Sequence, residues 1–345
     1  METTMNVLLT GASGTVGTEV LNQLIQNETI RLTVFDIKKR KAVNLFKRYK
    51  SVNVIWGNLF NEHDIQRIPE NLDAVIHLAA IIPPRADEQP ELTYKVNVLG
   101  TKLLINQLER TSPDAFFLYS SSISVYGDRV NNPYITVTDP LLPSDNDKYA
   151  ESKINAEQLI QNSKLDWTIF RLAAIMKNHK ISKLMFHMPL TTLLEISTPV
   201  DTAKAFTEGI KQREQLSGKV FNLGGGERCC ISYREFLQRS FQLYGLGKLN
   251  FPAYAFAMRN FHCGLLVDGD ILNNLLHFRH DTMESYFTQT KRSIPIIMKI
   301  FGFIFRIPIK RSLLKQSEPY RAVKTNNLNL IHHFFWQSNF KTEIS

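Results

Sequence analysis

Short runs of apolar residues alternate with longer amphipathic segments through the first 240 residues of the chain. Uninterrupted apolar runs are typical of strands that are buried on both faces. Amphipathic segments between such strands favour helices that cover both faces of a parallel sheet. We therefore predict strands at 5–10, 31–35, 52–56, 74–77, 115–119, 167–171 and 219–222, and helices at 15–26, 37–49, 92–109, 148–162 and 201–211.

This alternation stops after about Gly245, where aromatic, histidine and basic residues become frequent. The pattern predicts an α/β protein with a Rossmann-type, doubly wound parallel sheet and a smaller, mostly helical C-terminal region. We place the nucleotide-binding domain and its catalytic residues at 1–245, with 170–200 facing the substrate, and the appended region at 246–345. Residues 338–345 are expected to fray.

Charge and cysteine usage narrow the function. The formal net charge is +9, yet residues 286–345 hold 10 Lys/Arg against 2 Asp/Glu, so the rest of the chain is almost neutral and a nucleic-acid surface is not expected. The three cysteines lack C-x-x-C spacing, and the histidines lack the spacing of a metal site, so we predict no metal. The cysteine usage and the absence of a secretory leader pattern favour the cytoplasm.

A glycine-rich segment follows the first predicted strand and opens the first predicted helix. Helix N-termini offer unpaired N–H groups and a favourable dipole to a phosphate, and glycines let a pyrophosphate approach the backbone. The spacing is G-x-x-G-x-x-G. We predict a dinucleotide-phosphate site formed by Gly11, Ser13, Gly14, Thr15, Val16 and Gly17.

Asp36 ends the second predicted strand, 19 residues beyond Gly17. An acidic residue at that place hydrogen-bonds the ribose hydroxyls of NAD and repels the additional phosphate of NADP. Lys38, Lys39 and Arg40 follow and could attract that phosphate, so NADP stays an alternative to NAD. The other interpretation of Asp36 is an N-cap of the helix predicted at 37–49.

Ser122, Tyr149 and Lys153 form a second pattern. Tyr149 and Lys153 are four residues apart on one predicted helix face, and Ser122 follows a predicted strand. Tyrosine alone is a poor base near neutral pH, but a nearby ammonium and a positively charged nicotinamide would stabilise its phenolate. Ser122 could hydrogen-bond the substrate oxygen, so these three residues are the predicted catalytic set.

With these residues in place, the chain resembles the extended short-chain dehydrogenase/reductases, which include the NAD-dependent epimerases and dehydratases. The resemblance covers residues 5 to about 240. The segments that carry it are TGASGTVG, Asp36, GNLF from Gly57, HLAA from His77, VNVLGT from Val96, SSSISVYG, YAESK from Tyr149 and FNLGGG from Phe221.

The resemblance implies roles for further residues. Asn58 and Leu59 would border the adenine, Ala79 and Ala80 would line the cofactor groove, and Asn97 would lie on a helix near the active site. Tyr149 would be the acid/base, and Lys153 would bind the ribose beside it.

The sequence departs from the family pattern at several positions. The family usually has an aspartate where this chain has Asn58, and a proline-containing turn where it has residues 171–176. Ile123 stands where the 4,6-dehydratases carry an acidic residue.

Two classes of function follow. The first is an enzyme that transfers hydride at a hydroxyl or carbonyl carbon of a small sugar-, sterol- or lipid-like substrate, as an epimerase, a dehydratase or a dehydrogenase/reductase. The alternative is a non-catalytic dinucleotide sensor or scaffold. The patterns favour the enzyme, because the tyrosine and the lysine are both retained.

The segment 292–310 combines apolar and basic residues. On one continuous helix, Arg292, Lys299, Arg306 and Lys310 would form a narrow basic stripe on an otherwise apolar cylinder. Such a helix suits a lipid headgroup layer, and the apolar run is too short to span a membrane. Packing in an internal groove or at a homodimer interface is the alternative.

Overall fold

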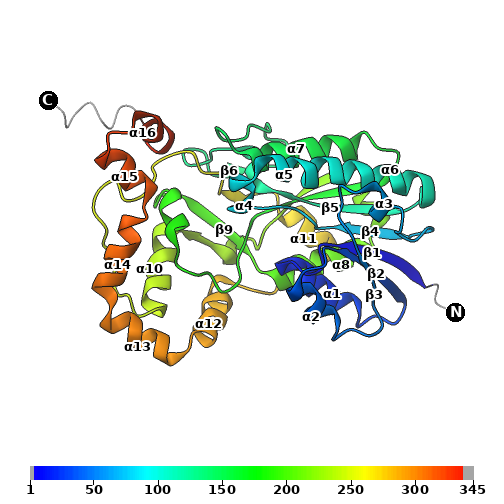
Figure 1. Cartoon of the computed structure of the whole chain (residues 1–345), viewed down its shortest axis with the longest axis horizontal. Coiled ribbons are helices and arrows are strands. Elements are labelled where there is room, and N and C mark those ends of the chain that lie inside the picture. The colour runs from blue at the N-terminus through cyan, green and yellow to red at the C-terminus, as the bar shows by residue number, and fades with distance from the viewer. Residues whose placement is uncertain (1–3, 337–345) are drawn as a thin grey trace.

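The computed structural model describes residues 4–336 and contains a seven-stranded parallel sheet at its centre (Figure 1). The strand order is β10-β7-β5-β4-β1-β2-β3. The predicted Rossmann-type architecture is thereby confirmed. The strands are β1 (Met5–Thr10), β2 (Ile30–Asp36), β3 (Asn53–Trp56), β4 (Ala74–His77), β5 (Phe116–Ser122), β7 (Asp166–Leu172) and β10 (Lys219–Leu223).

Two apolar cores lie on opposite faces of this sheet. One joins the sheet to α1 (Thr15–Leu24), α2 (Arg40–Phe46), α8 (Pro199–Gly209), α9 (Arg213–Leu216) and α11 (Asp270–Leu276). The other joins it to α3 (Glu62–Ile65), α6 (Thr101–Thr111) and α7 (Lys148–Gln161). Helices therefore cover both faces, which explains why the central strands are continuous apolar runs.

Two predicted helices are shorter or less regular than expected. The helix predicted at 37–49 exists only as α2, because residues 37–39 form a tight turn, in which the Lys39 N–H donates to the Ile37 carbonyl at 2.8 Å, and Lys39 is the N-cap. The helix predicted at 92–109 consists of α5 (Pro90–Tyr94), a π-helical segment η1 (Lys95–Gly100) and α6. The wider π turn includes Asn97, and π turns are frequent at functional sites.

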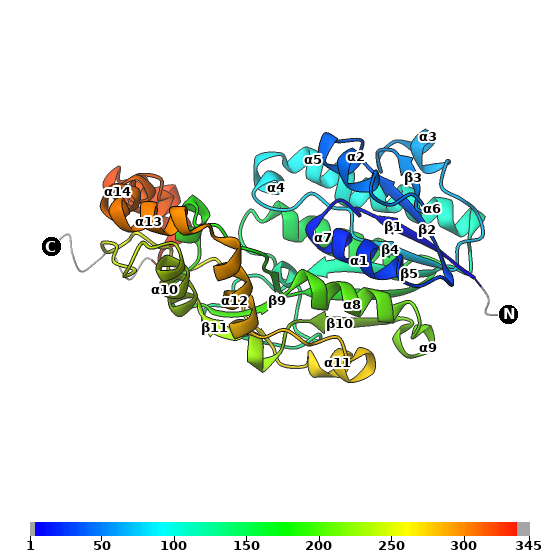
Figure 2. The same cartoon turned by 90° about the horizontal axis from the view of Figure 1, so that it is seen from below.

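A second lobe lies beside the carboxyl ends of the central strands (Figures 1 and 2). Its small sheet has the order β11-β9-β8, and its core joins that sheet to the helical elements. The elements are β8 (Ala174–Ile175), η3 (Lys183–His187), β9 (Leu193–Ser197), η4 (Glu227–Cys229), β11 (Cys230–Ser232), α10 (Tyr233–Leu243) and α12 (Met283–Ser293). The remaining short elements are α4 (Arg85–Glu88), η2 (Ile123–Tyr126) and the pair β6 (Tyr134–Ile135) and β12 (Leu265–Leu266).

The last four helices of the described residues lie along the outer side of this lobe (Figure 1). They are α13 (Ile296–Ile304), α14 (Arg306–Lys315), α15 (Glu318–Lys324) and α16 (Leu328–Phe334). The prediction of one continuous helix over 292–310 is wrong: Pro295 separates α12 from α13, and the chain breaks again at Phe305. Pro308 explains the second break, since its ring blocks continued helix through the preceding turn.

No helix within residues 4–336 has the length and apolar character needed to cross a membrane. Residues 338–345, where we expected fraying, lie outside the described part.

Candidate functional site

The glycine loop between β1 and α1 is shaped by close backbone contacts. Gly11 has φ +72°, and a Cβ on it would lie 2.7 Å from the Ala79 Cα. A Cβ on Gly17 would lie 2.2 Å from the Gly11 carbonyl oxygen. Gly14 is the N-cap of α1, and no side chain caps the helix. Larger residues would therefore displace this loop, and the helix N-terminus fits an anionic group.

Asp36 is fixed against the glycine loop by two backbone hydrogen bonds. Its carboxylate accepts from the Ser13 N–H at 2.7 Å and from the Ile37 N–H at 2.7 Å. Because α2 starts after Lys39 and has no side-chain cap, the interpretation of Asp36 as its N-cap is wrong. The remaining lone pairs of the carboxylate lie at the carboxyl end of β2, beside the helix N-terminus. Thr15 is exposed, and Val16 packs against the core.

Asn58 and Leu59, which follow β3, differ in their surroundings. The Asn58 Oδ1 atom is buried and has no hydrogen-bond partner among residues 4–336, whereas its backbone N–H donates to Asp64 at 2.9 Å. Leu59 is buried, and a Cβ on Gly100 would meet its Cβ at 2.8 Å. An unsatisfied buried acceptor is costly, so Asn58 fits a bound group that donates a hydrogen bond, such as an adenine amino group.

The segment after β4 lies directly over the first strand. The Ala79 N–H donates to the Thr10 hydroxyl at 3.2 Å, and Ala80 is half-buried. Asn97 holds the continuation of this segment: its amide accepts from the Ile81 N–H at 2.8 Å and donates to the Ile81 carbonyl at 3.0 Å. The structure thus places Asn97 behind the groove.

Asn97 also connects the segment after β4 to the helix that bears Tyr149 and Lys153, two of the predicted catalytic residues. Its Nδ2 donates to the Ser152 hydroxyl on α7 at 3.0 Å. Asn97 itself is buried. It therefore ties the loop after β4 to α7 and fixes the position of both.

Tyr149 and Ser122 are brought together by the start of α7 and the end of β5. The Asp147 side chain caps α7 by accepting from the Ala150 N–H at 2.8 Å. The Ser122 hydroxyl accepts from the Ser124 N–H at 3.2 Å, and the Ser122 side chain lies near enough to Tyr149 to influence its pKa. Burial raises the pKa of Tyr149 to about 12, although Ser122 acts in the lowering direction.

Lys153 lies on the same buried face of α7 as Tyr149. Its Nζ donates to the Ser120 carbonyl at 2.7 Å and to the Tyr119 hydroxyl at 3.3 Å. Burial lowers the pKa of Lys153 to about 7. We expected Lys153 and a nicotinamide ring to lower the pKa of Tyr149 together. In the structure that pKa is raised, because burial outweighs the opposite effect of Ser122.

Sequence analysis missed a buried ion pair on the helix that carries Tyr149 and Lys153. Arg171 on β7 donates to Glu157 on α7 at 2.8 Å, and Arg171 also donates to the Tyr126 hydroxyl at 2.9 Å. Ser121, which precedes Ser122, donates to the same carboxylate. The missed signal was spacing, since Glu157 follows Lys153 by four residues and therefore shares its helix face.

His77 is a buried structural residue, as its place in a strand indicated. It bridges the hydroxyls of Thr10 at 2.7 Å and Thr101 at 3.0 Å. Burial, with a smaller contribution from the Lys153 charge, lowers the pKa of His77 to about 3, so the ring is neutral. Within residues 4–336, no three His, Cys, Asp or Glu side chains gather where they could hold a metal ion.

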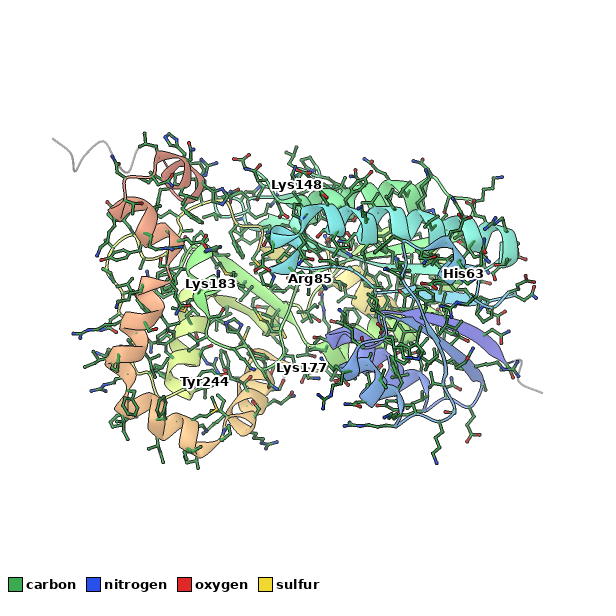
Figure 3. All side chains as sticks on the ribbon, in the orientation of Figure 1. His63, Arg85, Lys148, Lys177, Lys183 and Tyr244 are labelled. Carbon is green, nitrogen blue, oxygen red and sulfur yellow. The ribbon has the colours of Figure 1, made fainter. Side chains whose placement is uncertain are left out.

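The two lobes contact each other beside the glycine-loop helix. Lys177, which follows β8, forms an ion pair with Glu19 on α1 at 2.8 Å, and Figure 3 shows Lys177 on the side of its lobe that faces α1. A polar hollow of about 290 Å³ lies beside η2, which follows the end of β5, and is lined by Tyr126, Asp128, Arg129, Pro140, Leu142, Pro143, Ser144, Asp145, Arg259 and Asn260.

Residues 7–187 match the sequence model of the NAD dependent epimerase/dehydratase family. D-erythronate dehydrogenase of Haemophilus influenzae is 27% identical over 163 residues, which are 46% of this chain and 50% of that protein. The chain thus spans about half the length of that relative. UDP-glucose 4-epimerase of Klebsiella pneumoniae is 33% identical over 38% of this chain and 99% of the relative. A sterol-4-alpha-carboxylate 3-dehydrogenase of Schizosaccharomyces pombe is 28% identical over 45% of each chain.

Solved structures share the fold over most of the chain. UDP-glucuronic acid 4-epimerase from Bacillus cereus, solved with UDP-glucuronic acid and NAD, has a TM-score of 0.70 and 19% identity over 84% of this chain and all of its own. A short-chain dehydrogenase/reductase superfamily protein from Agrobacterium tumefaciens, solved with NAD, has a TM-score of 0.66 and 17% identity over 87% of this chain and 99% of its own. At these identities the likeness establishes the architecture.

Proposed function

The chain belongs to the NAD-dependent epimerase/dehydratase family of the extended short-chain dehydrogenase/reductases, and from this premise we propose that it is an enzyme that transfers hydride at a hydroxyl or carbonyl carbon of a small substrate. The observation that carries the proposal is the burial of Tyr149 and Lys153 on one face of α7, where the Lys153 Nζ lies 5.8 Å from the centre of the Tyr149 ring, with Ser122 at the end of the neighbouring strand β5. A dinucleotide sensor would not need this arrangement.

The cofactor that fits the loop is NAD. Gly11, Gly14 and Gly17 would admit the pyrophosphate at the N-terminus of α1, and the Asp36 carboxylate would accept hydrogen bonds from the ribose. The unpaired Asn58 Oδ1 would accept one from the adenine. A carboxylate at Asp36 disfavours the additional phosphate of NADP, and NAD is also the cofactor in the related structures described above.

Each catalytic residue then has a separate task. When bound, NAD supplies a hydride acceptor and, in its oxidised form, a positively charged ring. Tyr149 would take the proton from a substrate hydroxyl, or return it to a carbonyl in the reverse direction. Ser122 would hold the substrate oxygen while its charge changes, and Lys153 would bind the ribose and add positive charge near Tyr149.

We propose a sugar-, sterol- or lipid-like substrate with a secondary hydroxyl group. The similar proteins include epimerases named for UDP-glucose and dehydrogenases named for D-erythronate and for sterol carboxylates. Ile123 lacks the carboxylate of the 4,6-dehydratases, which favours an epimerase or a net dehydrogenase.

The test uses the full chain, NAD and a panel of hydroxy acids, sugar nucleotides and 3-hydroxysterols. NADH absorbance reports net oxidation, and chromatography of the recovered substrate reports epimerisation. We expect one class to be converted and Tyr149→Phe to lower turnover by at least about 100-fold while NAD affinity is kept. Lys153→Met should lower both the turnover and the NAD affinity.

Tyr134→Phe is the matched control, because Tyr134 is exposed on β6 and should leave the rate unchanged. Near-normal turnover of the converted substrate by Tyr149→Phe would overturn the catalytic assignment. NAD binding without conversion of any substrate class would favour the sensor.

A further inference from the structure

Helix α13 and the start of α14 expose an unusual amount of apolar surface. Of the nine residues of α13 only Gly302 is buried, and Ile297 is 72% exposed. We call these side chains the apolar face. It consists of Ile296, Ile297, Met298, Ile300, Phe301, Phe303, Ile304, Phe305 and Ile307, each at least 43% exposed. Contiguous exposed apolar side chains of this number mark an interaction surface.

The fold holds α13 by its backbone and leaves most of its side chains exposed. A Cβ on Gly302 would lie 1.9 Å from the Tyr244 carbonyl oxygen, and a Cβ on Gly245 would lie 2.3 Å from the Lys299 carbonyl oxygen. The helix therefore packs closely on the turn after α10 through two glycines. Its large side chains contribute little to that contact.

Positive charge surrounds the apolar face. Seven cations lie between residues 291 and 315, and none of them forms an ion pair with an acidic side chain within residues 4–336. Glu318 is the only acidic residue from 285 to 336, and it pairs with His187 and Arg321. The cations are Lys291, Arg292, Lys299, Arg306, Lys310, Arg311 and Lys315.

Four cations surround one hollow at the edge of this face. Its volume is about 560 Å³, and it is lined by Leu246, Gly247, Lys248, Asn250, Arg306, Ile307, Lys310 and Arg311, with no acidic side chain among them. The Lys310 Nζ donates to the Lys248 carbonyl and to the Asn250 Oδ1, each at 2.6 Å. These bonds fix the ammonium in place, and its charge remains available to an anion.

We propose that α13 and the first turn of α14 form a contact surface for an anionic lipid bilayer. The apolar face would enter the boundary between headgroups and acyl chains, while Arg306, Lys310 and Arg311 would bind lipid phosphates. The helices lie along the outer side of the second lobe, away from the central sheet, so a docked molecule would keep its nucleotide domain in water (Figures 1 and 2).

Charge favours a bilayer over a second copy of the chain. A two-fold interface on this face would bring the cations of both copies into one contact, and the face offers no acidic side chain to neutralise them. An anionic lipid surface neutralises them, and each basic residue near such a surface contributes favourably. The proposal does not depend on the identity of the enzyme substrate.

The test is vesicle flotation of the full chain at low salt. The vesicles are made of phosphatidylcholine alone, or of equal parts phosphatidylcholine and phosphatidylserine. We expect binding to the anionic vesicles that weakens as salt is added. The triple variant Ile297→Ser, Phe303→Ser, Ile304→Ser should lose most of it. Arg306→Gln with Arg311→Gln should lower the partition coefficient by roughly 10- to 30-fold, since each basic residue contributes about 1 kcal/mol.

Matched controls use residues of equal exposure elsewhere. Ile271→Ser on α11 and Lys47→Gln with Arg48→Gln after α2 should bind as the wild type does. Absence of flotation with both vesicle types would overturn the proposal. The proposal would also be overturned if the chain did not bind lipid but formed a stable dimer that Phe303→Ser dissociates. That result would assign the apolar face to a second copy.

Discussion

Glu157 and Arg171 form a buried ion pair that joins the helix bearing Tyr149 and Lys153 to the neighbouring strand. The guanidinium Nη2 lies 2.8 Å from the carboxylate, and the side chains are 1% and 6% exposed. The same carboxylate accepts from Ser121, and the guanidinium donates to Tyr126, whose hydroxyl donates to Asn222 at 2.7 Å. This network connects α7 to β5, β7 and β10, so we infer that it positions the catalytic face.

Removing one partner of this pair should be costly. Glu157→Gln leaves the Arg171 charge buried without its counterion, and we expect a loss of about 3–5 kcal/mol in the free energy of unfolding. Urea denaturation measures it. The double variant Glu157→Leu, Arg171→Met removes both charges and should be more stable than the single variant.

The exposed pair Lys211–Glu208 provides the control for that experiment, and Glu208→Gln should cost less than about 1 kcal/mol. An unfolding free energy of Glu157→Gln close to that of the wild type would show that the buried pair is energetically neutral.

Lys153 should make stability depend on pH. Its pKa is about 7 in the folded protein and 10.5 ordinarily, so between these values the unfolded chain binds more protons. Stability should therefore rise with pH across this window and fall as pH drops toward 7. The change attributable to Lys153 between pH 7 and pH 9 is about 2 kcal/mol.

Chemical denaturation without cofactor at both pH values measures this change, and Lys153→Met should lose that part of the pH dependence. Equal pH slopes in the wild type and Lys153→Met would contradict the assignment. Lys164→Met, at an exposed position after α7, is the control.

Gly302 should be intolerant of a side chain. Alanine normally favours a helix over glycine by up to about 1 kcal/mol. Here the added Cβ would lie 1.9 Å from the Tyr244 carbonyl oxygen, a backbone atom, so α13 would have to move. We expect Gly302→Ala to cost about 1–3 kcal/mol, as overpacking does, and to increase amide hydrogen exchange in α13. Ile304→Ala on the same helix is the control, and unchanged exchange in Gly302→Ala would refute the close contact.

The sequence predicted the central sheet well because burial on both faces leaves a direct signal. The apolar run 31–35 became β2 (30–36), and 74–77 became β4 without change. The glycine loop and the Tyr149–Lys153 pair were found because their spacing is local. The spacing of Glu157 from Lys153 indicates a shared helix face, but it does not identify the partner Arg171, which lies on another element and is buried with Glu157 only in the folded chain.

The helix boundaries were less predictable because side-chain and proline effects decide them. Residues 37–39 form a tight turn before α2, although their composition suits a helix. In 292–310 the apolar and basic periodicity suggested one helix, but Pro295 and Pro308 divide it. The basic residues therefore surround the apolar face from three helices, an arrangement that no single helical projection describes.

Asp36 should determine cofactor preference. Its carboxylate already accepts from the Ser13 N–H, which holds it beside the glycine loop where a ribose would bind. Asp36→Ala removes charge-assisted hydrogen bonds of about 1.5–3 kcal/mol, so NAD affinity should fall about 10- to 100-fold. NADP should be less affected, because its phosphate no longer meets the carboxylate and Lys38, Lys39 and Arg40 lie nearby in sequence.

Calorimetry with NAD and with NADP measures both affinities, and thus the change in the ratio of NAD affinity to NADP affinity. Asp36→Asn separates the contributions of charge and shape, because it can keep the hydrogen bond from Ser13 while it loses the charge. If the charge of Asp36 determines cofactor preference, Asp36→Asn should shift the ratio of NAD affinity to NADP affinity nearly as far as Asp36→Ala does. Glu70→Ala, an exposed acidic residue before β4, should leave the ratio unchanged. Tighter NADP binding by the wild type would reverse the assignment and make the three basic residues the phosphate site.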